Sequence, residues 1–529
     1  MSGNDYMSSK EPSSPNASSD PVSLLALPSK KGPWQKFVSW IWDSDYYEKS
    51  NAERTLVFKL DCFMLTAMTL GWWVKNLDQS NLAQAYVSGM KESLHITGNQ
   101  YTYMTTIYSA VVCVMQIPSN FIVLKVRPSW FLAASEIGWG VFTFAQAGAQ
   151  SYQAMYGFRF CIALFESFYY PVAFFLLGSW YTKKELGKRI SLWFVASPAG
   201  SAFSGYMQAG IYKNMNGLHG LEGWRWLYIM CGVITIPIGL LIFYLVPDFP
   251  SNTNTWYLTP TERELALARC ARNGTDTVSS KINKSTIFSA VKSWQFFILV
   301  PWFMLHGLET NNGKQFANYL KGFSYSVSAR NILPSTMYII QIPCIIFYAY
   351  MSDRLAGKGR VWVIAAVCAW AMVPTGILGL WAPSEGARMF AFLANGSVYV
   401  TPLFFTWVAE LCHGETEKRA FITGAICCWW YCVDAWLPTI IWLQTDGPRF
   451  KKGFLTSFCA AVFAFVGVFV IQFFQVRDQR IARRLQEQRE EEGGEDGVVG
   501  VEKGDDEVED GDVEEKVGVE SVPGELVRP

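Results

Sequence analysis

The sequence is poor in charged residues. Asp, Glu, Lys and Arg make up 17% of its 529 residues, against roughly 25% in typical soluble domains. Histidine is scarcer still, with four in the chain. A soluble protein of this length needs polar helix faces that this composition does not supply, so we expect the lipid bilayer to be its main solvent.

Two kinds of site are missing as well. No Gly-x-x-x-x-Gly-Lys-Ser/Thr sequence occurs, so we expect no nucleotide-binding loop, and an ion gradient is the natural energy source. His95, His219, His306 and His413 are widely separated, which argues against a membrane-bound enzyme. We therefore expect no catalytic residues, no metal, no cofactor and no nucleic-acid partner.

The 12 cysteines do not suggest a disulfide framework. All but Cys270 and Cys412 fall in apolar segments, where free cysteine behaves as a small hydrophobic residue. The cluster of Cys427, Cys428 and Cys432 has no histidine nearby in the sequence, so we do not expect it to bind a metal.

What is present is a series of apolar runs, each long enough to cross a hydrocarbon core of about 30 Å as a helix. They form two groups of six. The sequence therefore predicts an all-α membrane protein with twelve transmembrane helices in two six-helix pseudo-repeats. The expected spans are 58–77, 101–123, 130–149, 153–180, 190–211, 225–247, 294–313, 328–350, 361–381, 388–410, 420–443 and 454–476.

The chain also divides by composition. Lys and Arg concentrate at the helix flanks of one side, which predicts that both termini are cytoplasmic. The segment after 476 is acidic and lacks aromatic residues, as disordered segments do. The expected parts are a mostly disordered cytoplasmic tail (1–54), two six-helix bundles (55–247 and 293–476), a cytoplasmic linker (248–292) and an acidic disordered cytoplasmic tail (477–529).

Short motifs recur in register with the helix count. Gln116-Ile117-Pro118 lies late in the second expected helix, and Gln341-Ile342-Pro343 lies in the eighth. Six-plus-six parallel repeats are the architecture of the major facilitator superfamily. The segment GWWVKNLDQSNLAQAYVSGMKESLHITGNQ at 71–100, with QIPSN at 116–120 and VRPSW at 126–130, resembles the fungal anion:cation symporter branch of that superfamily. Within the branch it is most similar to the pantothenate transporters, and biotin carriers come second.

The resemblance implies a secondary active transporter that takes up a small organic anion with protons by alternating access. Pantothenate is the first expected substrate; biotin, allantoate-like and nicotinate-like carboxylates are alternatives, as is a nutrient sensor on the same fold that does not transport. It further implies a multi-pass protein of the plasma membrane, with the bilayer, protons and the anion as partners. We expect a monomer.

The superfamily has a basic loop signature of Gly-x-x-x-Asp-Arg-x-Gly-Arg-Arg type. In the first half only Arg127 and its neighbours remain, whereas Asp353, Arg354 and Arg360 match it better in the second half. By resemblance these four residues are gating groups that hold helix ends together. Many members of the branch have Asp-Arg where this chain has Asp78-Gln79, so no anion-binding role is carried over to that position.

Charged groups inside the membrane are costly and need a reason. Arg159 and Glu166 are seven residues apart, about two helical turns, and so share a face. We expect Arg159 to bind the substrate carboxylate and Glu166 to carry protons. The alternative is a structural pair that braces the bundle.

Two other segments combine polar groups at helical spacing. His306 and Glu309 are expected to exchange protons, with Asn311 binding substrate, unless they cap the end of the helix in water. On the first helix, Asp78 is a proton-coupling candidate and Asn81 a substrate-binding one, and Lys75 is a possible structural partner of Asp78. Asp434 is a secondary candidate with no obvious partner. Glu136 and Glu410 are expected to face water near the membrane surfaces.

Overall fold

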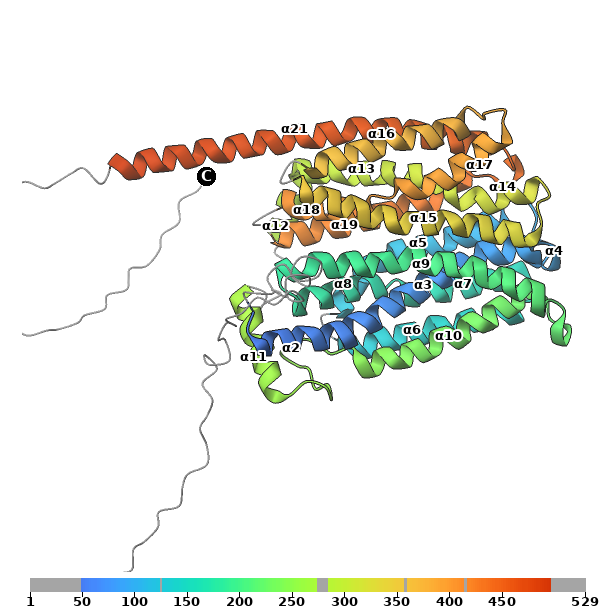
Figure 1. Cartoon of the computed structure of the whole chain (residues 1–529), viewed down its shortest axis with the longest axis horizontal. Coiled ribbons are helices and arrows are strands. Elements are labelled where there is room, and N and C mark those ends of the chain that lie inside the picture. Colours follow the sequence, from blue (N-terminus) through green and yellow to red (C-terminus); the bar gives the residue numbers. More distant parts are fainter. Residues whose placement is uncertain (1–48, 124–125, 274–283, 356–358, 413–415, 496–529) are drawn as a thin grey trace, which may run out of the picture. The chain divides into compact units, whose positions relative to one another are not determined.

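The computed structural model describes residues 49–123, 126–273, 284–355, 359–412 and 416–495. These residues form helices and no strand, as the sequence predicts. They divide into a unit ending at Phe474, which holds the helices of both halves, and a second unit from Gln475 to the C-terminus. Figure 1 shows the helices of the first unit running side by side.

The first half contains six helical segments, several of them made of consecutive helices. The first runs from Asn51 to Ser93, with a kink at Ser88 and Gly89, and is treated as one segment. The elements are α2 (Asn51–Leu60), η3 (Asp61–Leu65), α3 (Thr66–Ala85), η4 (Tyr86–Met90) and α4 (Lys91–Ser93); α5 (Gln100–Val123); α6 (Pro128–Ala145) with η5 (Gln146–Gly148); α7 (Tyr152–Glu166) with α8 (Tyr169–Trp180); α9 (Lys183–Met215), followed by η6 (Leu218–Gly220); and α10 (Gly223–Leu245).

Two helices of the linker follow, α11 (Pro260–Asn273) and α12 (Lys284–Lys292). The second half then repeats the pattern of six segments. They are α13 (Trp294–Thr310), η7 (Asn311–Gln315) and α14 (Phe316–Gly322); α15 (Val327–Arg354); α16 (Gly359–Gly379); α17 (Glu385–Ala394), η8 (Asn395–Val398) and α18 (Thr401–Leu411); α19 (Thr416–Trp436) with α20 (Pro438–Ile441), followed by η9 (Gln444–Asp446); and α21 (Lys451–Glu495).

The twelve segments fall where the apolar runs predict them. Among the described residues, 8 helices are long and apolar enough to cross a membrane by length and composition alone. Each half has its own apolar core, centred on buried tryptophans such as Trp139 and Trp193 in the first half and Trp302 and Trp407 in the second. The two halves are therefore separate packing units within one helical body.

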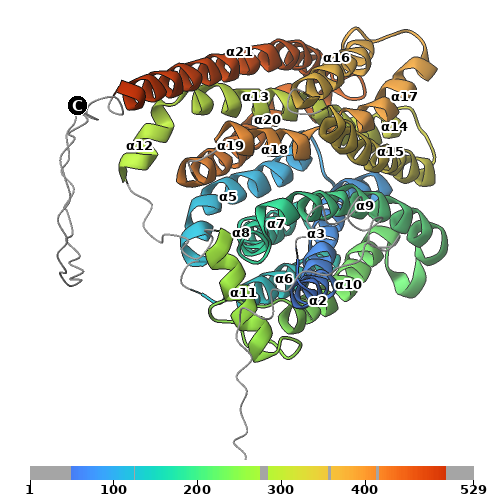
Figure 2. The same ribbon diagram turned by 60° about the vertical axis from the view of Figure 1, so that its left-hand side comes forward.

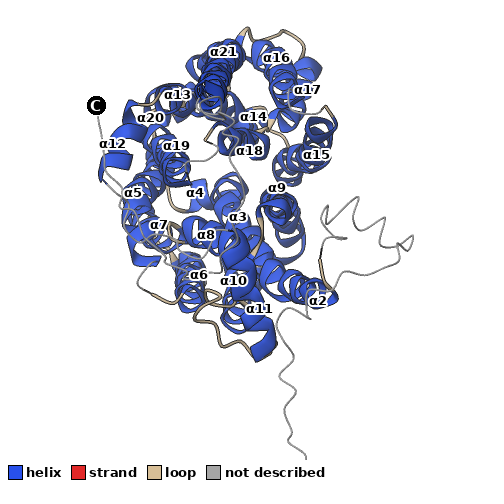
Figure 3. Cartoon of the chain, turned by 90° about the vertical axis from the view of Figure 1, so that its left-hand side faces the viewer, coloured by secondary structure: helices blue, strands red, loops and turns tan. Residues whose placement is uncertain are grey.

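The halves meet along two helix pairs. In the contacts of the described residues, α9 packs along α15 and α5 packs along α19. Figure 3 shows both pairs end on, with α3 near the middle of the body. Gly205 fixes how closely α9 and α15 approach, because a Cβ atom there would lie 2.5 Å from the Asn331 carbonyl oxygen.

Several hydrogen bonds between the halves lie at one end of the body, which we call the far side. There Lys321 forms an ion pair with Glu92 at 2.8 Å. The Asn331 amide donates to the Ser88 hydroxyl at 2.9 Å, and the backbone N–H of Gln444 donates to Asn99 at 3.1 Å. The other end, where α2 and α9 begin, is called the α2 side. The described contacts thus tie the halves together at the far side.

The linker helix α11 lies beside α2 (Figure 2), and buried ion pairs anchor it to the first half. Arg269 donates two hydrogen bonds to Glu185 at the start of α9, at 2.7 and 2.8 Å. On the same side, but within the first half itself, Arg189 of α9 binds both oxygens of Asp61 in η3 at 2.7 Å. This two-bond arrangement favours arginine over lysine. Such groups are stable in a buried position only when they are paired.

The first helix begins earlier than the expected bundle boundary at residue 55. Ser50 and Glu53 form a reciprocal capping box that starts α2 at Asn51. Glu262 of α11 reaches back to Lys59 at 2.8 Å. Burial alone would raise the pKa of Glu262, but the Lys59 ammonium and the Thr259 groups hold it below its ordinary value. The linker is therefore attached to the bundle.

The last helix also differs from its expected end at 476. α21 continues to Glu495, so the described part of the expected disordered tail, residues 477–495, is helical. These residues are rich in Arg, Gln and Glu, which favour helices, and they extend an existing helix without a new nucleation step. Residues 496–529 and 1–48 lie outside the described residues, and the disorder expected there stays a prediction.

Candidate functional site

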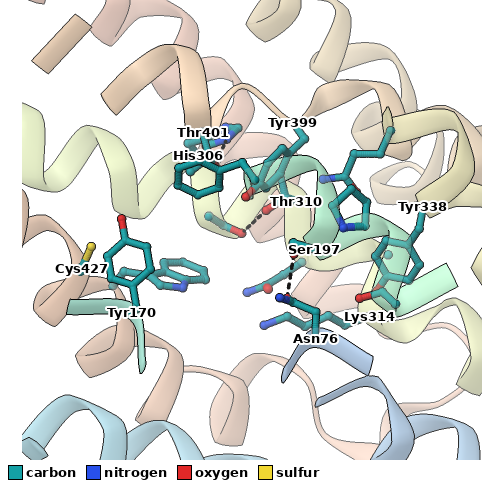
Figure 4. Close-up of a pocket in the computed structure, with 18 of the residues that line it drawn as sticks. Asn76, Tyr170, Ser197, His306, Thr310, Lys314, Tyr338, Tyr399, Thr401 and Cys427 are labelled. Carbon is teal, nitrogen blue, oxygen red and sulfur yellow. Dashed lines mark hydrogen bonds between the residues drawn. The ribbon is translucent and has the colours of Figure 1, made fainter. Parts of the chain in front are cut away.

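A cavity of about 350 Å³ lies between the two halves. This volume is in the range of small-molecule sites. Its wall is built from α3, α5, α7, α8 and α9 of the first half and from α13, η7, α15, η8, α18 and α19 of the second (Figure 4). Polar lining residues include Lys75, Asn76, Glu166, Ser197, His306, Thr310, Asn311, Lys314, Gln341 and Thr401.

Three helices are interrupted where they meet this cavity. α7 gives way to α8 at Ser167, α13 passes through η7 at Asn311, and α17 passes through η8 at Gly396. A broken helix exposes backbone polar groups, which are tolerated at membrane depth only where they line a cavity or are buried in protein. Here Asn395 donates to the Glu309 carbonyl oxygen at 3.3 Å. The breaks therefore supply polar groups to the wall.

His306 and Glu309 form a buried pair beside the cavity. The His306 Nδ1 atom lies 2.6 Å from Glu309 Oε1, and the Thr401 hydroxyl lies 3.4 Å from Nε2. The residues are 1% and 0% exposed, which excludes the alternative of a helix cap in open water. His306 belongs to the wall and Glu309 lies behind it. A proton bound to this pair can reside on either of two adjacent atoms, His306 Nδ1 or Glu309 Oε1.

Glu166 belongs to the opposite wall and is connected to Arg159 through a third residue. Its Oε2 atom accepts hydrogen bonds from Gln79 and from the Tyr108 hydroxyl, both at 2.6 Å. The Arg159 guanidinium stacks over the Tyr108 ring, 4.7 Å from its centroid. Arg159 and Glu166 do share the inner face of α7, as expected, but Tyr108 joins them and no ion pair does.

The predicted substrate-binding residues lie at different depths. Asn311 is in the cavity wall, whereas Arg159 and Asn81 are buried outside the lining. The Asn81 amide donates to Cys231, and its oxygen accepts from Ser204 at 2.8 Å. These bonds turn Asn81 towards α9 and α10.

Asp78 faces the same way as Asn81. It accepts hydrogen bonds from the Thr235 hydroxyl at 3.1 Å and from the Asn81 amide at 3.3 Å. It is 4% exposed and is not a lining residue. The possible pair with Lys75 does not form, because no ion pair joins these two described residues.

Lys75 is a wall residue that sequence reasoning assigned only a structural role. Its side chain is 5% exposed and lines the cavity, with Nζ 5.0 Å from the centroid of the Trp72 ring. The signal was present in the sequence, since a lysine flanked by Trp-Trp-Val in a membrane helix needs a reason. The three-residue spacing between Lys75 and Asp78 suggested an ion pair between them, so a place for Lys75 in the cavity wall was not considered.

The comparisons with known proteins agree with this architecture. The family model described as Major Facilitator Superfamily matches residues 63–433. The chain belongs to the major facilitator superfamily. Solved structures of the same fold include a D-xylose–proton symporter, with a TM-score of 0.57 at 11% identity, covering 78% of this chain and 97% of that one. This membership confirms the predicted fold class and makes the protein a multi-pass membrane transporter.

Curated relatives in this superfamily carry vitamin names. A pantothenate transporter of Schizosaccharomyces pombe is 29% identical over 454 residues, which cover 84% of this chain and 87% of the relative. A vitamin H transporter of Saccharomyces cerevisiae is 29% identical over 462 residues, covering 85% and 77%. A pantothenate transporter of the same yeast is 29% identical over 437 residues, covering 80% and 85%. The resemblance to this branch of the superfamily is confirmed.

The residues of the superfamily loop signature lie on the α2 side. Arg360 forms an ion pair with Glu410 at 2.9 Å, which joins α16 to α18. Arg354 is exposed and stacks on Tyr350 of its own helix at 4.9 Å, and Arg127 is exposed at the start of α6. The side chain of Asp353 lies outside the described residues. The gating role of these four residues stays a prediction.

Two of three further acidic residues, Glu136 and Asp434, differ from their sequence-based interpretation, whereas Glu410 agrees with it. Glu136 was expected to face water, but it is 0% exposed, and both of its carboxyl oxygens lack a hydrogen-bond partner among the described residues. Glu410 is 46% exposed and partly engaged with Arg360. Asp434 does have partners, which lie on other helices. It pairs with Lys314 at 3.2 Å and accepts from Ser109 at 3.0 Å.

Proposed function

We propose that this chain is a secondary active transporter that couples uptake of a small organic anion to protons by alternating access. Pantothenate is the first substrate to test, since two of the relatives named above are pantothenate transporters. Biotin is the second, because a vitamin H transporter is equally similar in identity. The protein acts as a monomer in the plasma membrane, with both termini in the cytoplasm.

The observation that carries the proton coupling is the buried pair of His306 and Glu309 in contact with the cavity. Inside a membrane an isolated charge is costly, so a proton that enters or leaves this pair changes the cost of closing the cavity. Histidine exchanges protons near neutral pH. When the cavity opens to one side of the membrane, the pair can exchange a proton with that side. Glu166 provides a second proton site on the opposite wall.

The remaining predicted residues support these groups. Asn311 contacts substrate at the wall. Arg159 acts from behind it by fixing Tyr108 and, through its hydroxyl, Glu166, while Asp78 and Asn81 stabilise the polar seam that joins α3 to α9 and α10. Arg127, Asp353, Arg354 and Arg360 control opening at the α2 side, which the basic flanks favour as the cytoplasmic side.

The arrangement of the halves supports alternating access. Hydrogen bonds at the far side, such as those of Asn331 and Gln444, hold the halves together there. A transporter cycle requires bonds between the halves to break as α9 moves relative to α15 and α5 moves relative to α19.

The test is uptake of labelled pantothenate into cells that lack their own carrier, measured at an external pH of about 5 and about 7.5. We expect saturable uptake that is faster at the lower pH, collapses with a protonophore, and is competed by biotin more weakly than by pantothenate. Competition in the reverse order would make biotin the substrate. Binding without net uptake of any of these acids, or of allantoate and nicotinate, would favour the sensor alternative.

Topology is tested separately. A tag placed after Pro529 should be inaccessible to antibody in intact cells and accessible after permeabilisation. Labelling of intact cells would contradict the proposed orientation.

A further inference from the structure

The cavity wall contains two lysines among the described residues, and they are in different states. Lys314 of η7 is 56% exposed in its side chain and forms an ion pair with Asp434. Lys75 of α3 is almost completely buried, yet no ion pair or hydrogen bond joins it to another described residue. Its ammonium lies against the face of the Trp72 ring and is attracted by the charge of Glu166, another wall residue that makes no ion pair with it. A buried ammonium with so little compensation is expensive, and it lies where a ligand would bind.

The surroundings of Lys75 are organised to hold it there. Asn76, the next residue, is fixed by accepting a hydrogen bond from Ser197 at 2.7 Å and by donating one to the Trp72 carbonyl oxygen at 2.7 Å (Figure 4). This keeps α3 in contact with α9 at the depth of the cavity. Trp72 itself is packed against Trp193, with ring centroids 4.5 Å apart. The ring that contacts the ammonium is therefore held in place.

The other cations near the cavity are already engaged. Arg159 stacks on Tyr108 outside the lining, and His306 is paired with Glu309. We infer that Lys75 is the anchor for the substrate's carboxylate and determines that this site accepts monoanionic acids in preference to their neutral analogues. The inference rests on the proposed function for its substrate class. It assigns the anchoring role to Lys75 and not to Arg159, which the sequence favoured.

Gln79 lies one helical turn after Lys75. Residues four apart lie on the same helix face, and Gln79 donates to Glu166 from that face. Gln79 thus binds the wall carboxylate with a neutral amide and brings no positive charge to the wall. The positive charge for an incoming anion is then supplied one turn earlier.

The test uses purified full-length protein and measures affinity, so that it does not depend on proton coupling. The ligands are pantothenate and biotin, each paired with a neutral analogue in which an alcohol or amide replaces the carboxylate. For Lys75→Gln we expect affinity for the acid to fall at least tenfold while affinity for the neutral analogue changes less than threefold. Lys75→Arg should keep most of the preference for the acid. Lys213→Gln, at an exposed lysine of α9, is the matched control and should bind as the wild type does.

Equal loss of acid and neutral analogue in Lys75→Gln, or no loss of either, would overturn the inference. A Lys75→Met variant guards against misfolding, because it keeps most of the side-chain length. If the Gln and Met variants both fail to reach the membrane while Lys75→Arg does so normally, the role of Lys75 is structural and the inference is wrong. Acid binding that depends on Lys75 without proton-driven uptake would overturn the proposed function alone. Failure of wild-type protein to bind any of these acids would overturn both.

Discussion

The sulfur atoms of Cys113 in α5 and Cys428 in α19 lie 4.0 Å apart, across the contact between the two halves. Each thiol is also near the backbone carbonyl of the other residue, at 3.6 and 3.9 Å. An oxidant that removes two electrons and two protons from this pair would join the halves covalently.

We expect this oxidation to stop transport, because α5 and α19 then can no longer move apart. Treatment of membrane vesicles with a thiol oxidant such as diamide should reduce uptake at least tenfold and be reversed by a thiol reductant. Cys113→Ser should transport normally and resist the treatment. Equal inhibition of that variant would show that another thiol is responsible.

We expect a substitution in the pair of His306 and Glu309 to reduce proton-driven accumulation of substrate more than exchange of substrate. Glu309→Gln keeps the side-chain shape but removes the carboxylate that holds the shared proton, so proton-driven accumulation should fall at least tenfold. Exchange of labelled for unlabelled substrate at equilibrium should remain within about threefold, since it needs no net proton movement. His219→Gln, at an exposed histidine of η6, is the control. A proportional loss of both activities in Glu309→Gln would remove the pair from the coupling mechanism.

Arg159 is expected to act through Tyr108. Arg159→Ala removes the cation that stacks on the ring and should lower uptake per surface molecule at least tenfold. Arg159→Lys keeps the charge but loses the flat guanidinium face, so a several-fold loss is expected. Tyr108→Phe keeps the ring and removes the hydrogen bond to Glu166. It should alter the pH dependence of uptake with little change in surface amount. Normal uptake in all three variants would leave this group without a role in transport.

We expect Arg269 of α11 to contribute more to the free energy of unfolding than Arg272 of the same helix. Arg269→Ala removes both hydrogen bonds to the buried Glu185, which keeps Lys49 as a partner, so we expect a loss of about 1.5–3 kcal/mol. Arg272 binds the buried Glu53 with a side chain that is 53% exposed, and Glu53 keeps Arg269 at 4.0 Å, so Arg272→Ala should cost less than Arg269→Ala. Thermal unfolding of the two variants in the same detergent measures the difference. Equal melting temperatures would contradict the proposed attachment of the linker.

The transmembrane architecture was predictable because it depends on apolar length alone. Helix ends were less so, since α2 starts where Ser50 and Glu53 cap it and α21 continues through a polar sequence that favours helix. The spacing of seven between Arg159 and Glu166 did place both on one face. Tyr108, which lies between Arg159 and Glu166, could not be predicted from the sequence of that helix because it comes from a different segment of the chain.

Lys75 shows a second limit of reading spacing from sequence. Residues three apart on an α-helix differ in direction by roughly 60°. That angle is enough for Lys75 to reach the cavity while Asp78 faces α10. Glu136 was misjudged for a related reason: its position along the span was estimated from uncertain helix ends, whereas its burial depends on the packing of α6 against α10 and α3.

The lack of a carboxylate partner for Lys75 has a kinetic consequence. A loaded carrier closes over an ammonium paired with the substrate, whereas an empty one must close over an ammonium that has no carboxylate in contact with it, so the empty protein should change sides more slowly than the loaded one. Substrate inside the cell should then accelerate uptake from outside. In a cell that already holds much of the substrate, internal and external molecules would exchange quickly with little net gain.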